Sequence, residues 1–147
     1  MRLVSLSRAG SGIGMLASVI LLAATLASAE DGRDFAGFYG LSNVVDLGVE
    51  VAATFTLEIF NYSGADVTSA TVTVENFLLP GEIYASFMPV DIPYRQNAQL
   101  VQAVLVIPPW EYDNWQNGGS PNVQISFTDA AGNMVIRGVE LTWMLFE

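Results

Sequence analysis

The sequence contains no cysteine, no histidine and no lysine, and these absences exclude several kinds of chemistry. Without cysteine the chain has no disulfide, no thiol nucleophile and no lipid attachment through an N-terminal cysteine. Without histidine there is no serine–histidine–aspartate triad and, with cysteine also missing, the usual zinc ligands are absent. Without lysine the chain forms no Schiff base with a carbonyl substrate. What remains is carboxylate chemistry or the binding of a hard cation.

Positive charge is also scarce, with five basic residues, all arginine, against fifteen acidic residues. Arg2 and Arg8 lie among the first 29 residues, so the part from Glu30 onward carries three arginines against all fifteen acids, a formal charge of −12. Such a surface repels phosphate backbones and anionic lipid, so we expect no nucleic-acid partner and no peripheral membrane binding. The acids are scattered along the chain, which is typical of a solubilising coat.

The first 29 residues have the layout of a secretory signal peptide. Two arginines precede an almost wholly apolar run over 13–26, and Ala27-Ser28-Ala29 then provides a small-x-small site ahead of the first acids. A retained membrane anchor is the alternative, but a spanning helix needs roughly 20 apolar residues, and this run is shorter. We therefore expect cleavage after Ala29 and a secreted, periplasmic or cell-envelope location with no membrane attachment. We expect residues 30–37 to be a flexible lead and residues 38–147 to form one domain.

The remaining chain reads as a succession of strands separated by turns. Apolar and polar residues alternate with a period of two over 49–60 and 67–76, and again over 123–128. The segment 97–107 is a long apolar strand that Pro108 and Pro109 end. Weaker strands are predicted over 38–45, over 83–88 as an edge strand limited by Pro89, and over 134–143 with a bulge at Gly138.

About seven short strands without a helical period favour an all-β fold. We predict an immunoglobulin-like (fibronectin type III-like) two-sheet antiparallel sandwich. Its core should be built from one face of each strand, and the residues predicted to be buried are Phe55, Leu57, Val72, Leu105, Ile125 and Phe127.

Two segments resemble bacterial cell-adhesion-related (CARDB-like) and other immunoglobulin-like domains. The first is Phe55–Gly64 with the strand that follows at Val72 and Val74, and the second is Val123–Asn133 with Val139–Trp143. The resemblance implies a sandwich and a non-catalytic module, and it supplies no catalytic residues. Fold alone does not determine function.

The segment 108–121 is rich in aromatic residues and is expected to be a loop. Its indoles and phenol could stack on sugar rings or anchor a protein, or they could simply cap the end of the core, which is the interpretation we favour. The candidate binding residues are Trp110, Glu111, Tyr112, Asp113 and Trp115. A carboxylate pair at i and i+2 is unsuited to glycoside cleavage, and calcium-loop spacing is missing. We therefore predict no enzyme activity, no metal and no cofactor.

The long strand presents a second candidate surface formed by Leu100, Val104 and Val106. These residues lie opposite its assigned core face, and contiguous exposed apolar surface often marks an interface. Either residues 35–41 or the apolar tail 144–146 cover the strand, or a second chain does so by face packing or strand addition. The sequence thus predicts a non-enzymatic module for protein interaction, self-association or envelope structure. The alternative is a carbohydrate-binding module that uses the aromatic loop.

Overall fold

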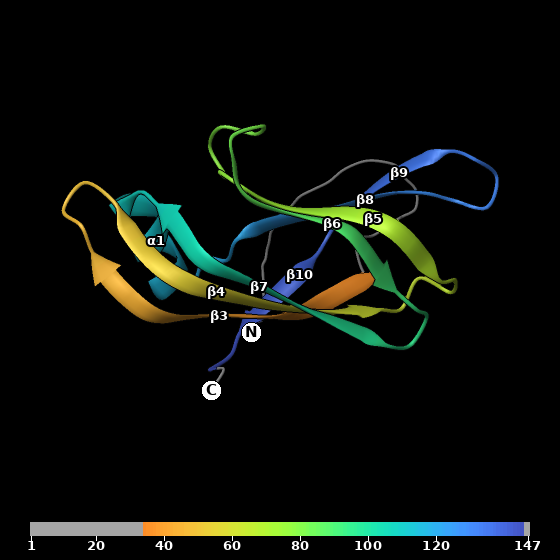
Figure 1. Cartoon of the computed structure of the whole chain (residues 1–147), viewed down its shortest axis with the longest axis horizontal. Coiled ribbons are helices and arrows are strands. Elements are labelled where there is room, and N and C mark those ends of the chain that lie inside the picture. The colour runs from red at the N-terminus through yellow and green to blue at the C-terminus, as the bar shows by residue number, and fades with distance from the viewer. Residues whose placement is uncertain (1–33, 146–147) are drawn as a thin grey trace. The chain divides into compact units, whose positions relative to one another are not determined.

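A computed structural model describes residues 34–145 as a strand-rich domain with one short helix (Figure 1). The compact unit that begins at Phe35 holds every strand described below. The predicted signal peptide lies outside the described residues. Within residues 34–145 we find no helix with the length and apolar character that a membrane crossing requires.

The strands form two sheets of four, packed face to face as a sandwich. The first sheet has the order β10 (Glu140–Trp143), β3 (Phe35–Asp46), β4 (Val51–Asn61), β7 (Asn97–Ile107). The second has the order β6 (Ile83–Ile92), β5 (Val67–Glu75), β8 (Asn122–Thr128), β9 (Met134–Gly138). Neighbouring strands are antiparallel, except that β10 runs parallel to β3. The predicted immunoglobulin-like sandwich is confirmed, with eight described strands in place of about seven.

The core lies between the two sheets and follows directly from the period-two alternation. Along β4 every second residue from Val51 to Asn61 is buried, and the intervening residues are half-exposed. Five of the six residues predicted to be buried are so, and the exception is Phe127. Phe127 is half-buried, with its ring in an edge-to-face contact with Phe35 at 6.0 Å between centroids.

The predicted flexible lead over 30–37 is too long, because β3 already begins at Phe35. The Phe35 side chain is fully buried, and Gly37 lies so close to β4 that a Cβ there would be 1.8 Å from the Glu58 carbonyl oxygen. Glycine is needed at this position because any side chain would separate the two strands. The apolar content of this short segment is therefore structural.

The predicted last strand over 134–143 is in fact two strands in different sheets. β9 pairs with β8, whereas β10 pairs with β3 in the opposite sheet. The slip in alternation at Gly138 marks this change of sheet rather than a bulge. Where the chain leaves β9, Val139 N–H still donates to the Val123 carbonyl of β8 at 3.0 Å. β6 is an edge strand as predicted, but it continues past Pro89 to Ile92.

The segment 108–121 is not wholly a loop, since it contains helix α1 (Pro109–Gln116). Pro109 stands at the start of the helix, where its missing N–H costs no intrahelical hydrogen bond. After the helix the chain turns at Gly118, which has a positive φ of 99°. A helix of eight residues with no apolar face carries too little periodicity to be detected from sequence.

Candidate functional site

Helix α1 lies at one end of the sandwich, beside the hairpin that joins β3 to β4 (Figure 1). A depression of about 400 Å³ separates the two, and it is lined by Val44, Asp46, Gly48, Val51, Pro109, Tyr112 and Asp113. Across residues 34–145 no three acidic side chains gather closely enough to hold a metal ion. The depression is therefore lined by a mixture of apolar and acidic side chains, and the described residues offer no metal site there.

Glu111 is buried at the inner side of α1, with 1% of its surface exposed. Its Oε1 accepts a hydrogen bond from the Tyr84 hydroxyl at 3.0 Å, and its Oε2 accepts one from Trp115 Nε1 at 2.9 Å. The backbone N–H of Phe77 also donates to this carboxylate. Burial raises the pKa of Glu111, and these three hydrogen bonds oppose that rise by favouring the charged form. Because both oxygens are engaged, the residue fastens α1 to β6 and to the β5–β6 loop.

Trp115 also belongs to the core, with 3% of its surface exposed. Its ring meets the Tyr39 ring edge to face at 6.0 Å and lies 6.2 Å from the Phe55 ring. The Tyr39 hydroxyl donates to the carbonyl oxygens of Trp115 at 3.4 Å and Gly119 at 3.2 Å, and burial raises the pKa of Tyr39. The Trp115 indole thus caps the open end of the sandwich, as the favoured interpretation predicted, whereas Trp110, for which the same role was predicted, is exposed.

The five candidate residues of the aromatic segment do not share one surface. Glu111 and Trp115 are buried, Tyr112 is half-buried, and Trp110 and Asp113 are exposed. Trp110 has 42% of its surface exposed and has no second exposed indole from this segment beside it. A coplanar tryptophan pair of the kind that would grip a sugar ring is therefore not present here.

The face of β7 differs from the prediction because the strand contains a bulge. β7 pairs residue by residue with β4 from Asn97 to Gln102, but the next pair joins Leu105 to Ala53. Two residues of β7 oppose Thr54, whose Oγ1 donates to the Ala103 carbonyl at 3.1 Å. A bulge reverses the side on which later side chains point. The set of β7 residues whose side chains point into the core therefore changes at the bulge.

This reversal corrects the candidate partner surface. Leu100 was predicted to face outward, but it is half-buried against the core, whereas Val101, assigned to the core face, is 55% exposed. Val104 and Val106 do face outward, and Val104 is 62% exposed. The surface observed on β7 consists of Val101, Val104 and Val106, and we call it the β7 patch.

The predicted intramolecular cover of this strand is not formed by residues 35–41. These residues belong to β3, which lies in the same sheet and is separated from β7 by β4. The described part of the tail, Met144 and Leu145, is exposed and follows β10 at the opposite edge of that sheet. Phe146 lies outside the described residues.

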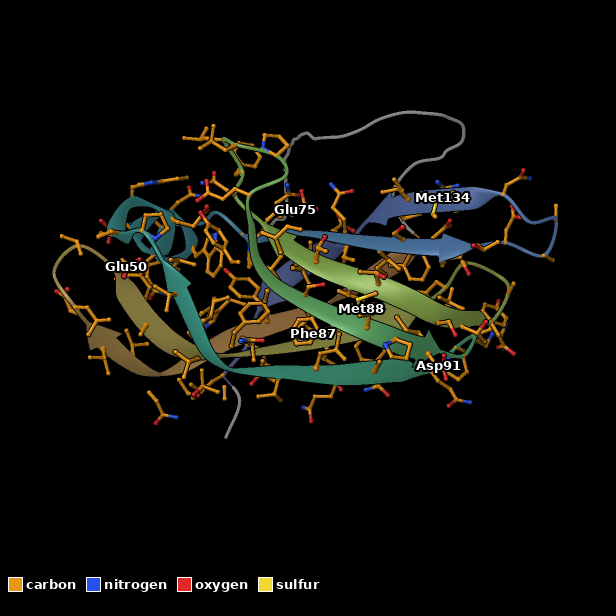
Figure 2. All side chains as sticks on the ribbon, turned by 45° about the horizontal axis from the view of Figure 1, so that its top comes forward. Glu50, Glu75, Phe87, Met88, Asp91 and Met134 are labelled. Atoms are coloured by element: carbon orange, nitrogen blue, oxygen red, sulfur yellow. The ribbon has the colours of Figure 1, made fainter. Side chains whose placement is uncertain are left out.

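β7 is unlike the other three edge strands of the sandwich. Its eleven residues include no charge, proline or glycine. β6 contains Pro89 and Asp91 (Asp91 is labelled in Figure 2) and pairs irregularly. β9 and β10 are only five and four residues long and carry Arg137 and Glu140. Natural edge strands are protected by such devices. The bulge is the one irregularity of β7, and it leaves residues 97–102 regular.

A second exposed apolar group was not predicted from sequence. Phe77, Leu78 and Leu79 in the β5–β6 loop are each at least 60% exposed. The buried Asn76 side chain organises this loop, because its Oδ1 accepts from the N–H groups of Leu78 at 2.8 Å and Leu79 at 3.1 Å. The sequence signal that could have revealed this group is the run of three large apolar residues directly before a proline–glycine turn.

Comparison with known proteins leaves the family open. No protein-family model matches the sequence, and no curated protein matches it. Among solved structures, the chain is similar to a GH20 exo-β-N-acetylglucosaminidase from Vibrio harveyi, both as an inactive mutant (TM-score 0.46) and in complex with N-acetylglucosamine (TM-score 0.47). In both cases identity is 14%, and the match covers 78% of this chain but only 19% of the other. A likeness this weak carries no argument about activity or ligand.

Proposed function

We propose that this chain is a non-enzymatic, extracytoplasmic protein-interaction module that binds an extended segment of a partner along the edge of β7. The observation that carries the proposal is the long, uncharged edge of β7, regular over residues 97–102, with its exposed patch of Val101, Val104 and Val106. Export rests on the signal-like sequence of residues 1–29.

Strand addition explains why an edge and an apolar patch occur together. An added strand takes its affinity from backbone N–H and C=O groups and its specificity from alternate side chains. The outer edge of β7 offers backbone N–H and C=O groups, and the β7 patch offers apolar contacts on one face of the sheet. The partner segment that fits is extended, β-branched on one face and free of acidic residues along the contact, because the domain around it is strongly acidic.

The chemistry of the described residues favours binding over catalysis. Glu111 is the one fully buried carboxyl group among them, and its oxygens are occupied by Tyr84, Trp115 and a backbone donor. The carbohydrate-binding alternative would have Trp110 as its one exposed indole, beside the half-buried Tyr112, since Trp115 belongs to the core. The β7 edge is therefore the better-supported site.

The test is a selection of binding peptides followed by mapping of the contact. A displayed library of random ten-residue peptides is panned on the purified chain, and the bound peptide is expected to shift the amide NMR signals of residues 97–107. Val101→Lys and Val104→Lys should each weaken binding about tenfold, because a lysine would be covered without a partner charge.

Ile136→Lys is the matched control. Ile136 is 58% exposed on the edge strand β9, so the same change is made at similar exposure away from β7. Peptides whose shifts map to another part of the sandwich, or whose affinity is indifferent to the two valine substitutions, would contradict the proposal.

A further inference from the structure

We infer that the strand added to β7 is β7 of a second copy of this chain, paired antiparallel about a two-fold axis. This inference rests on the proposed function, since it names the partner for the same edge. It would make the working unit a symmetric dimer in which the first sheets of two sandwiches join into one continuous sheet.

Symmetry makes β7 complementary to itself. A two-fold interface uses the same surface on both subunits, so one edge strand is sufficient to form it. In an antiparallel pair with the axis perpendicular to the sheet, the outer faces of both copies lie on the same side. The β7 patches of the two copies then lie next to each other, and each shields the other's exposed valines from water.

Charge restricts where two copies can meet. The chain carries a formal charge of −10, so most approaches of one copy to another are repulsive. The edge strands β6 and β10 would also bring Asp91 or Glu140 close to its own copy. β7 has no charged residue between Asn97 and Ile107, and backbone pairing there brings no like charges together within the strand.

The two ends of β7 carry opposite charges, and this favours the antiparallel orientation. Arg95 is exposed just before β7 begins, with its guanidinium 5.3 Å from the Tyr94 ring centroid. At the other end Ile107 pairs with Val51, which places the exposed Glu50 beside the end of β7 (Figure 2). Antiparallel pairing brings Arg95 of each copy toward Glu50 of the other, whereas parallel pairing would bring like charges toward each other.

The experiment is sedimentation of the purified chain over a range of concentrations. We expect a monomer–dimer equilibrium, and Val101→Lys should raise the dimer dissociation constant at least about tenfold because the lysines of both copies would meet. Arg95→Glu and Glu50→Arg should each weaken the dimer, and the double variant should restore it. Ile136→Lys should leave association unchanged, and thermal melting verifies that every variant folds.

Distinct results would overturn the inference. If the chain is monomeric at all concentrations but still binds selected peptides at β7, self-pairing is excluded and the proposed function stands. A monomer in which the β7 amides that do not pair with β4 are protected from hydrogen exchange would contradict both the self-pairing and the proposed function, because the chain itself would then cover the outer edge. If Val101→Lys leaves the dimer dissociation constant unchanged, the contact lies elsewhere on the chain. If both charge reversals leave it unchanged, the antiparallel orientation is wrong.

Discussion

At the scale of single residues, Glu111 couples the stability of this domain to pH. Its carboxyl group is buried under α1, and desolvation outweighs three hydrogen bonds to leave its pKa above the usual 4.5. An acid whose pKa is higher in the folded state binds its proton more tightly there than in the unfolded chain. Its favourable contribution is fully present below the unfolded pKa and is lost as pH rises through the folded pKa.

We therefore expect Glu111→Gln to change how stability depends on pH. As pH rises above about 4, the melting temperature of the wild type should fall relative to that of the variant, because the substituted amide never has to bear a buried charge. Melting followed by circular dichroism at each pH gives the difference. Asp113→Asn, an exposed carboxyl on the same helix, is the control. If the difference in melting temperature between the wild type and Glu111→Gln stays constant with pH, Glu111 does not have this role.

At the scale of strands, β4 and β8 should differ in how much each phenylalanine stabilises the fold. Phe55 on β4 is fully buried, so Phe55→Ala should cost about 3–5 kcal/mol, a large share of the stability of a small domain. Phe127 on β8 is half-buried, and Phe127→Ala should cost clearly less because less apolar surface and a smaller cavity are involved. Urea denaturation measures both. Equal losses would show that the outer part of β8 is packed as tightly as β4.

Strands β4 and β7 show what the sequence could and could not predict. β4 alternates without interruption because it is an interior strand paired regularly along most of its length, and so its buried face was predictable. β7 is apolar on both faces, so nothing in its pattern revealed that the bulge at Ala103 and Val104 exchanges the faces of Leu100 and Val101. The role of Glu111 was equally hidden, since its partners Tyr84 and Trp115 come from different elements that only the folded chain brings together.

At the scale of the whole molecule, the start of β3 at Phe35 leaves residues 30–34 between the expected cleavage site and the sandwich. Cleavage there would leave the first strand intact. We expect exported protein to begin at Glu30, and N-terminal sequencing checks this. Ala29→Arg should block processing, because the site needs a small residue before the cut, and a longer form should accumulate. Exported protein that still begins at Met1 would disprove the prediction.

The parallel pair of β10 and β3 has a mechanical consequence. Four register pairs, from Glu140 with Ala36 to Trp143 with Tyr39, join the first and last described strands, and Met144 N–H adds a bond to the Tyr39 carbonyl at 2.8 Å. Tension applied to the N-terminal end of β3 and the C-terminal end of β10 pulls these two strands in opposite directions along their length. The hydrogen bonds between them are then loaded together in shear instead of being unzipped one at a time. The pairing of β3 with β10 therefore resists tension along the chain at the two strands where that tension enters the sandwich.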